Sequence, residues 1–172
     1  GKAYSLSSRP SDTLASITVK NVGGEFSSRL CALKKGDTLE ISHAYGHFNL
    51  QTKVPLVGIA AGVGLSPIWS ILAHNDHTEH QLHYTNTHEN RIVFADELAQ
   101  LKTCVQHYIT RQPDTKHHCG RLDIKKIIAS AETEAHFLIC GSVDFVRDIY
   151  RQLVQQGIDT LHISTEIFFG SE

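Results

Sequence analysis

The sequence predicts an α/β fold in which a parallel sheet follows a shorter stretch of antiparallel strands. From Val54 onward, apolar segments of strand length alternate with segments of helical periodicity, which is typical of β-α-β units and a parallel sheet. Before Val54 the pattern consists of short alternating runs separated by turns. The pattern changes near residues 50–55, so we expect two units, residues 1–52 and residues 53–172.

In the first unit, residues 14–22 alternate apolar and polar side chains, a glycine pair follows, and a second alternating run, residues 36–50, begins at a Gly-Asp turn. This pattern predicts antiparallel strands. In the second unit we expect four apolar strands with helical segments between them. The strands are 55–61, 80–86, 136–142 and 161–169, and the helical segments are 68–74, 94–105, 117–130 and 145–157.

Composition excludes some classes of function. The formal net charge is −2 with 20% charged residues, so no overall basic field would hold a nucleic acid. No run of about 18 apolar residues is long enough to span a bilayer, and the first residues do not resemble a secretory leader. The four cysteines lack the close C-x-x-C spacing of metal or cluster sites. We therefore expect a soluble protein of the reducing cytoplasm.

Twelve histidines raise the alternative of a metal site, with His74, His77 and His80 or the run 117–119 as ligands. A spacing of three residues can place two ligands on one face of a helix. The segment around His77, however, lacks the apolar residues that would support a helix, and we expect it to be a surface connection. We therefore predict no physiological metal site.

The segment Val54–His74 contains the clearest local signal for a ligand. An apolar strand ends at a turn containing Gly62 and Gly64, and a helical pattern begins at Ser66 and Pro67. Such a turn places backbone N–H groups at the positive end of a helix, where a phosphate binds well. Ser66 is a candidate N-cap or phosphate donor, and proline suits a first helical turn. The glycine pair alone equally indicates a tight strand-to-helix turn without a ligand.

The wording of this turn, AGVGLSP, resembles the G-G-x-G-x-[ST]-P turn of the ferredoxin–NADP reductase superfamily, close to its version in flavohaemoglobin reductase regions. Three further segments match that family in the same order along the chain. KAYSLSS is similar to its R-x-Y-S flavin motif, GEFSSRL to its G-x-x-S flavin-diphosphate turn, and ICGSVDFV with TEIFFG to its C-G-P and E-x-F ends. The resemblance covers essentially the whole chain.

The resemblance implies that residues 1–52 are part of a flavin-binding β-barrel. Tyr4 would contact the isoalloxazine of FAD and Ser5 its reactive N5 edge, with Lys2 and Ser7 on the same segment. Lys2 replaces the family's arginine, which keeps the charge but loses the planar fork that holds phosphate. Gly24 and Ser27 would meet the flavin diphosphate. His43 and Ala44 replace the Gly-Pro of a further family turn, so we expect that turn to differ.

In the second unit the resemblance places Gly62, Gly64 and Ser66 at the nucleotide diphosphate, and Cys140 with Gly141 beside the nicotinamide. Taken without the family, a buried cysteine is typical of plain packing. Glu166 would lie near the transfer site and Phe168 over the flavin. We expect Ser5, Cys140 and Glu166 to serve the reaction.

The implied activity is a flavin-dependent NAD(P)H oxidoreductase that transfers hydride to FAD and passes electrons to a haem, iron–sulfur or oxygenase partner. We expect NADH as the donor, because no cluster of Arg or Lys follows the strand 80–86. The family's barrel has strands before the R-x-Y-S segment, so we expect a fragment, or a barrel completed by another chain. The alternative is a non-catalytic nucleotide-binding module, with exposed edge strands that favour homo-oligomers.

Overall fold

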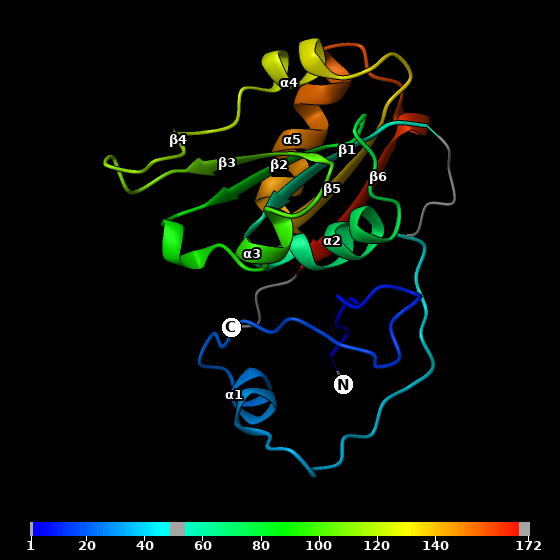
Figure 1. The fold of residues 1–172 in the computed structure, drawn as a ribbon, viewed down its shortest axis with the longest axis vertical. Coiled ribbons are helices and arrows are strands. Elements are labelled where there is room, and N and C mark those ends of the chain that lie inside the picture. Colours follow the sequence, from blue (N-terminus) through cyan, green and yellow to red (C-terminus); the bar gives the residue numbers. More distant parts are fainter. Residues whose placement is uncertain (1, 49–53, 169–172) are drawn as a thin grey trace.

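The computed structural model describes residues 2–48 and 54–168, and its centre is a six-stranded sheet (Figure 1). All strand pairs of the sheet are parallel, in the order β4-β3-β2-β1-β5-β6. The strands are β1 Leu56–Ala61, β2 Gln81–Asn86, β3 Cys104–Ile109, β4 His118–Cys119, β5 His136–Ser142 and β6 Ile163–Phe168. The predicted parallel sheet is confirmed.

Helices cover both faces of this sheet. They are α2 Leu65–His74, α3 Ala95–Leu98, α4 Ile124–Ser130 and α5 Val143–Gln155. A further helix, α1 Glu25–Ala32, lies away from the sheet in the first part of the chain. Single 3₁₀ turns are η1 Gly62–Gly64, η2 Glu89–Arg91 and η3 Thr160–His162. Figure 1 shows α2 and α3 on one face and α4 and α5 on the other. Strands covered on both faces are apolar throughout, which is why β1 and β5 are continuous apolar runs in the sequence.

The strand order reverses beside β1. Going out from β1, the chain adds β2, β3 and β4 on one side and then returns to place β5 and β6 on the other. In open α/β sheets, ligands bind beyond the carboxyl ends of the strands at such a reversal. The ends that meet here are those of β1 and β5, paired as far as Ala60 with Cys140.

Local sequence explains where α5 begins. Ser142 is its N-cap, and its hydroxyl accepts a hydrogen bond from the Phe145 N–H, which satisfies one of the free donors of the first turn. The buried side chains of α5 are Val146, Ile149 and Leu153, spaced by three and four residues so that they form one face. That face packs on the sheet opposite α2.

The region around β3 differs from the prediction. The expected helical segment 94–105 forms only one turn, α3, and its last residues begin strand β3, which the sequence pattern did not indicate. β3 carries Gln106, His107 and Tyr108 and is mostly half-buried. Only the two-residue β4 separates it from the edge of the sheet, so it does not need the apolar run by which the central strands were recognised.

Residues 2–48 lie on the side of the sheet covered by α2 and α3 (Figure 1). Their antiparallel pairing within the described chain is a single bridge between Leu6 and Ile17. The expected strands 14–22 and 36–50 do not form in the described residues, and the glycine turn leads into α1 instead. A strand requires a second strand along its length to pair its backbone groups, and among the described residues these runs have only the one bridge at Ile17. The expected barrel is therefore seen only as that bridge.

The predicted boundary between residues 52 and 53 lies in the segment 49–53, outside the described residues. The division into two units therefore stays a prediction. Within the part of the chain that is described, no helix has the length and apolar character needed to cross a bilayer.

Candidate functional site

The turn between β1 and α2 has the backbone geometry expected of a glycine turn. Gly62 has φ +54°, a left-handed conformation that other L-residues adopt at a cost of about 1–2 kcal/mol. A Cβ on Gly62 would meet no atom within 4 Å, so the surface of the turn is open at this residue. The N–H groups of Gly62 and Val63 open the helical segment and have no acceptor within it.

Gly64 is required for a different reason. A Cβ built there would lie 2.4 Å from the Cys140 carbonyl oxygen and 2.8 Å from the Gly141 nitrogen. The turn therefore packs directly against the backbone at the end of β5. This contact joins the two candidate segments, the glycine turn at 62–64 and the Cys140-Gly141 pair, into one structure.

Ser66 is not the N-cap of α2. The N-cap is Gly64, without a side-chain hydrogen bond, and Ser66 is the second residue of the helix. Its buried hydroxyl donates to the Val63 carbonyl at 2.8 Å. Pro67 lies in the first turn of α2, as predicted. Ser66 thus stabilises the turn from inside, and its role as a phosphate donor stays a prediction.

The three residues expected to serve the reaction lie together. Cys140 on β5 and Glu166 on β6 are paired in register at neighbouring positions of the sheet. The Ser5 hydroxyl donates to the Glu166 carboxylate, a hydrogen bond between residues 161 positions apart. Burial, assisted by the negative charge of Glu166, raises the pKa of the Cys140 thiol. The thiol therefore remains protonated at neutral pH and adds no charge to the site.

Gly141 and Phe168 surround this group. A Cβ on Gly141 would lie 2.7 Å from the Phe145 ring and 3.1 Å from the Ala61 side chain, so the glycine allows α5 and β1 to approach. Phe168 is half-buried and packs against the core cluster that contains Cys140. It pairs with Ser142 at the last step of the β5–β6 ladder.

The flavin candidates of the first unit are placed as follows. Tyr4 is half-buried and stacks on Phe26 of α1, with ring centroids 6.2 Å apart. Ser7 is buried against Ser16, with hydroxyl oxygens 3.2 Å apart, and Lys2 is exposed.

Gly24 and Ser27 form the start of α1. Gly24 is its N-cap residue, and the Ser27 hydroxyl donates to the Gly24 carbonyl at 3.2 Å while it accepts from the Val22 N–H at 3.3 Å. These bonds fix the entry to α1. Ser27 therefore has its hydroxyl engaged locally, and a diphosphate at this helix start would meet backbone N–H groups more readily than this side chain.

A second contact ties the first unit to the second. The Ser70 hydroxyl of α2 donates to the Ser8 carbonyl at 2.6 Å. Together with the bond from Ser5 to Glu166, it holds the segment around Tyr4 beside the carboxyl ends of β5 and β6. The segment expected to touch flavin and the strand ends expected to touch nicotinamide are thus adjacent.

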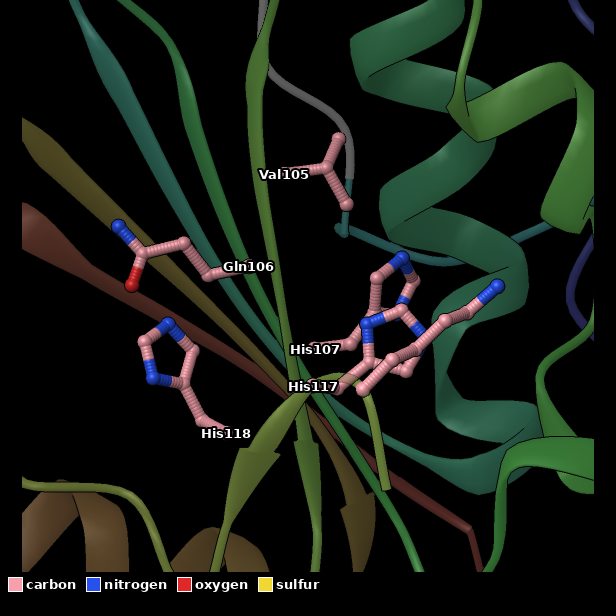
Figure 2. A pocket seen from close by; sticks show the side chains of 6 residues that line it. Val105, Gln106, His107, His117 and His118 are labelled. Atoms are coloured by element: carbon pink, nitrogen blue, oxygen red, sulfur yellow. The ribbon is translucent and has the colours of Figure 1, made fainter. Parts of the chain in front are cut away.

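Two pockets lie elsewhere. One, of about 300 Å³, is at the β3–β4 edge (Figure 2), and another, of about 400 Å³, involves α4 and the segment before β5. Neither includes Ser5, Cys140 or Glu166. Figure 2 shows His107 and His117 close together in the first pocket, with ring centroids 4.8 Å apart. Across the described ranges no three His, Cys, Asp or Glu side chains are arranged to hold a metal ion. The pockets therefore lie apart from the strand ends where Ser5, Cys140 and Glu166 are found.

Several residues of the site were not identified from the sequence. Tyr84 of β2 donates its hydroxyl proton to the Gly62 carbonyl at 3.0 Å, and Phe26 stacks on Tyr4. A buried tyrosine in an apolar strand requires a hydrogen-bond partner, which is a signal that something polar lies near Tyr84. The identity of that partner depends on how β1 and β2 are placed.

Comparison with known proteins agrees with this geometry. Residues 59–151 match the family described as oxidoreductase NAD-binding domain. The chain is 30% identical over 97% of its length to a flavohemoprotein of Bacillus subtilis, of which it covers 46%. The chain thus spans about half the length of the curated relatives it matches.

Solved structures share the fold. The flavohem-like FAD/NAD binding domain of nitric oxide dioxygenase from Vibrio cholerae aligns with a TM-score of 0.80 at 24% identity, covering 96% of this chain and 76% of that one. A ferredoxin NADP⁺ reductase from Neisseria gonorrhoeae with bound FAD and NADP aligns with a TM-score of 0.79 at 21% identity, covering 98% and 80%. The chain belongs to the oxidoreductase NAD-binding domain family and has the fold of these flavin- and nicotinamide-binding structures.

Proposed function

We propose that this chain is the reductase portion of a flavoprotein that takes hydride from NAD(P)H onto FAD and passes electrons to an acceptor protein or domain. The observation that supports the proposal most strongly is the grouping of Ser5, Cys140 and Glu166 at the carboxyl ends of β5 and β6. Residues from the start, middle and end of the chain meet there, beside the reversal of strand order where such sheets bind ligands.

The turn Gly62–Ser66 would hold the diphosphate of the nicotinamide nucleotide. Its open face at Gly62 and the free N–H groups of the first helical residues suit a phosphate. Gly64 brings this turn against Cys140 and Gly141. A nucleotide bound at the turn would therefore extend towards the Cys140 side chain without crossing the sheet.

For the flavin, the chain would contribute Lys2, Tyr4, Ser5 and Ser7, with Gly24 and Ser27 at the diphosphate. Bound flavin would accept hydride from reduced nicotinamide and release electrons singly or in pairs. The protein residues would orient the rings and exclude water. Phe168 would cover one side of the site, and the protonated Cys140 thiol would supply a small, uncharged contact.

Ser5 and Glu166 would control polarity at the point of transfer. The hydroxyl proton of Ser5 is directed at the Glu166 carboxylate, so the carboxylate fixes the position of the hydroxyl. In this arrangement Glu166 would hold a negative charge near a bound nicotinamide ring and would stabilise the positive charge that the ring gains on losing hydride. Neither residue has to transfer a proton for hydride to pass.

The first experiment is the absorption spectrum of the purified protein, alone and after addition of FAD. Bound flavin with its visible bands supports the reductase. ADP-ribose is NAD without its nicotinamide ring. A protein that binds ADP-ribose but not FAD would support the alternative of a non-catalytic nucleotide-binding module. Of the two predicted units, residues 1–52 would supply most contacts to flavin and residues 53–172 the contacts to the nicotinamide nucleotide, so the two ligands test the two units separately.

The second experiment measures flavin reduction by stopped flow in Ser5→Ala, Cys140→Ser and Glu166→Gln. We expect each variant to reduce FAD roughly 100- to 1,000-fold more slowly, as for loss of one oriented polar group, with smaller changes in stability. Glu134→Gln, an exposed carboxylate in the loop before β5, is the matched control. Unchanged reduction rates in all three variants would exclude these residues from the reaction.

We propose NADH as the preferred donor. The carboxyl end of β2 presents Thr85, Asn86 and Thr87, and Arg91 follows in η2. A 2′-phosphate would be held best by a cluster of cations. The run 85–91 contains only a single Lys or Arg side chain, Arg91. Steady-state measurement of kcat/KM for NADH and NADPH tests the preference, and a large advantage for NADPH would contradict it.

Electron acceptors are proposed from the relatives. Relatives of the chain include flavohemoproteins, so a haem protein or domain is the first acceptor to test, with iron–sulfur and oxygenase components next. Reduction of added cytochrome c by NADH, with and without FAD, would measure one-electron transfer from the chain. Sedimentation of the same samples would test the proposed homo-oligomer through exposed strand edges.

A further inference from the structure

Tyr84 connects the sheet to the phosphate turn. It lies on β2, is 0% exposed, and its hydroxyl donates to the Gly62 carbonyl at 3.0 Å. Burial raises the pKa of the phenol, so the hydroxyl keeps its proton under all ordinary conditions. Ala60 of β1, two residues before Gly62, is its partner in the sheet. The tyrosine therefore reaches the turn from the strand beside it.

The Tyr84 hydroxyl proton has a single acceptor among the partners of this side chain. The Val93 N–H donates to the Tyr84 oxygen at 3.5 Å, and an N–H cannot accept a proton in return. The Gly62 carbonyl is the remaining acceptor. The same carbonyl also accepts from the Leu65 N–H in the helical turn, so two donors hold it in place, one from the helix and one from the sheet.

A fixed carbonyl also fixes the N–H of the next residue. In a planar trans peptide, the carbonyl of Gly62 and the N–H of Val63 point in opposite directions. With the carbonyl directed inward at Tyr84, the Val63 N–H must point away from the buried phenol. It is one of the helix-start donors without an acceptor in the helix, and such donors bind phosphate oxygens.

A second observation marks this end of β2 as a place for a ligand. Asn86 lies two residues beyond Tyr84 on the same face of the strand and is 6% exposed. Its side chain is near enough to the phenol to lower the pKa that burial raises, but its amide nitrogen completes no hydrogen bond with the described residues. A buried donor left without an acceptor in a native protein is commonly satisfied by water or a ligand.

We propose that Tyr84 is a positioning residue for the nucleotide diphosphate, acting through the Gly62–Val63 peptide and not by touching the ligand. This inference rests on the proposed binding of a nicotinamide nucleotide at the turn. Without the hydroxyl, the Gly62 carbonyl keeps only its bond from Leu65, and the peptide can rotate. The Val63 N–H would then spend less time directed at the diphosphate.

The test is the variant Tyr84→Phe, which keeps the ring and its packing. Dissociation constants are measured by calorimetry for ADP-ribose, which carries the diphosphate, and by NMR titration for adenosine, which does not. We expect ADP-ribose to bind roughly 3- to 10-fold more weakly, the equivalent of one hydrogen bond, and adenosine to change less than about twofold. Tyr108→Phe removes a hydroxyl bonded to Gln106 and His83 and is the matched control, expected to bind both ligands like wild type.

The outcomes separate the two proposals. Wild-type protein that binds ADP-ribose, with Tyr84→Phe equal to it, would overturn the role of Tyr84 and leave the proposed function standing. Equal weakening for ADP-ribose and adenosine would also overturn it, since the effect would then be on the fold. Wild-type protein that fails to bind ADP-ribose would overturn both. As a second readout, the Val63 amide signal in ¹⁵N spectra should respond to ADP-ribose in wild type and respond less in Tyr84→Phe.

Discussion

Gly64→Ala provides the most direct test of how the turn is packed. The new Cβ would lie 2.4 Å from the Cys140 carbonyl oxygen, 2.7 Å from its carbonyl carbon and 2.8 Å from the Gly141 nitrogen. Close carbon-to-oxygen contacts in proteins are about 3.3–3.6 Å, so one of the two backbones must move by roughly 1 Å. The atoms in the way are backbone atoms of β5, which is paired on both sides by β1 and β6.

The magnitude follows from this constraint. Overpacking a core costs about 1–3 kcal/mol, and because β5 is held by both neighbours we expect the upper part of that range. For a protein of this size each kcal/mol lowers Tm by about 2–4 °C, so Gly64→Ala should melt roughly 6–12 °C below wild type. The shifted Cys140-Gly141 backbone should also weaken ADP-ribose binding in the folded variant.

Thermal and urea unfolding, followed by circular dichroism and by fluorescence of the single tryptophan, measure this effect. Trp69 lies on α2 and stacks on Phe94 with ring centroids 5.1 Å apart, so it reports the same region. Gly62→Ala is the control: its Cβ meets no atom, and it carries only the strain of φ +54°, about 1–2 kcal/mol. If the Tm of Gly64→Ala lies within about 2 °C of wild type, the expected clash between the new Cβ and the β5 backbone is refuted.

Two further predictions concern titratable groups. Cys140 is buried and has a raised pKa, whereas Cys31, Cys104 and Cys119 are exposed free thiols. A thiol reagent at pH 8 should therefore label three thiols quickly and Cys140 only when the protein unfolds. Rapid labelling of all four thiols would contradict the burial of Cys140. Burial lowers the pKa of His83 to about 4, from the usual 6.5. Between about pH 4 and 6.5 the unfolded chain therefore binds a proton on His83 that the folded protein does not. The free energy of unfolding should fall by up to about 3 kcal/mol as the pH drops from 6.5 to about 4. In His83→Gln the free energy of unfolding should change less with pH. If urea unfolding shows the same change with pH in the variant as in wild type, His83 is not its source.

Much of the sheet was predictable from the sequence. The runs at 55–61, 80–86 and 136–142 correspond to β1, β2 and β5, because central strands of a parallel sheet are buried on both faces and are rich in apolar residues. The glycines of the turn were recognisable for a similar reason. Only glycine satisfies a left-handed φ at Gly62 without strain and a backbone contact at Gly64 without a clash.

The remaining features depended on partners distant in the sequence. β3 lies next to the edge and needs no apolar run, so its half-polar pattern was not recognised as a strand, and its first two residues were included in the expected helical segment 94–105. The alternating runs before residue 49 have strand-like sequences, but a strand also needs a neighbour to accept its backbone hydrogen bonds. Ser66 had the right residue type for a cap, yet the helix begins at Leu65, and its hydroxyl is used inside the turn.

The sequence by itself determined the class of fold, the position of the glycine turn and the family, since each is encoded in residues that are near one another along the chain. The tertiary structure decided which side chains meet. Ser5 reaches Glu166 across 161 positions, and Tyr84 reaches Gly62 only because β2 pairs with β1. Hydrogen bonds between distant residues depend on the relative placement of whole strands, and no local pattern of residues specifies that placement.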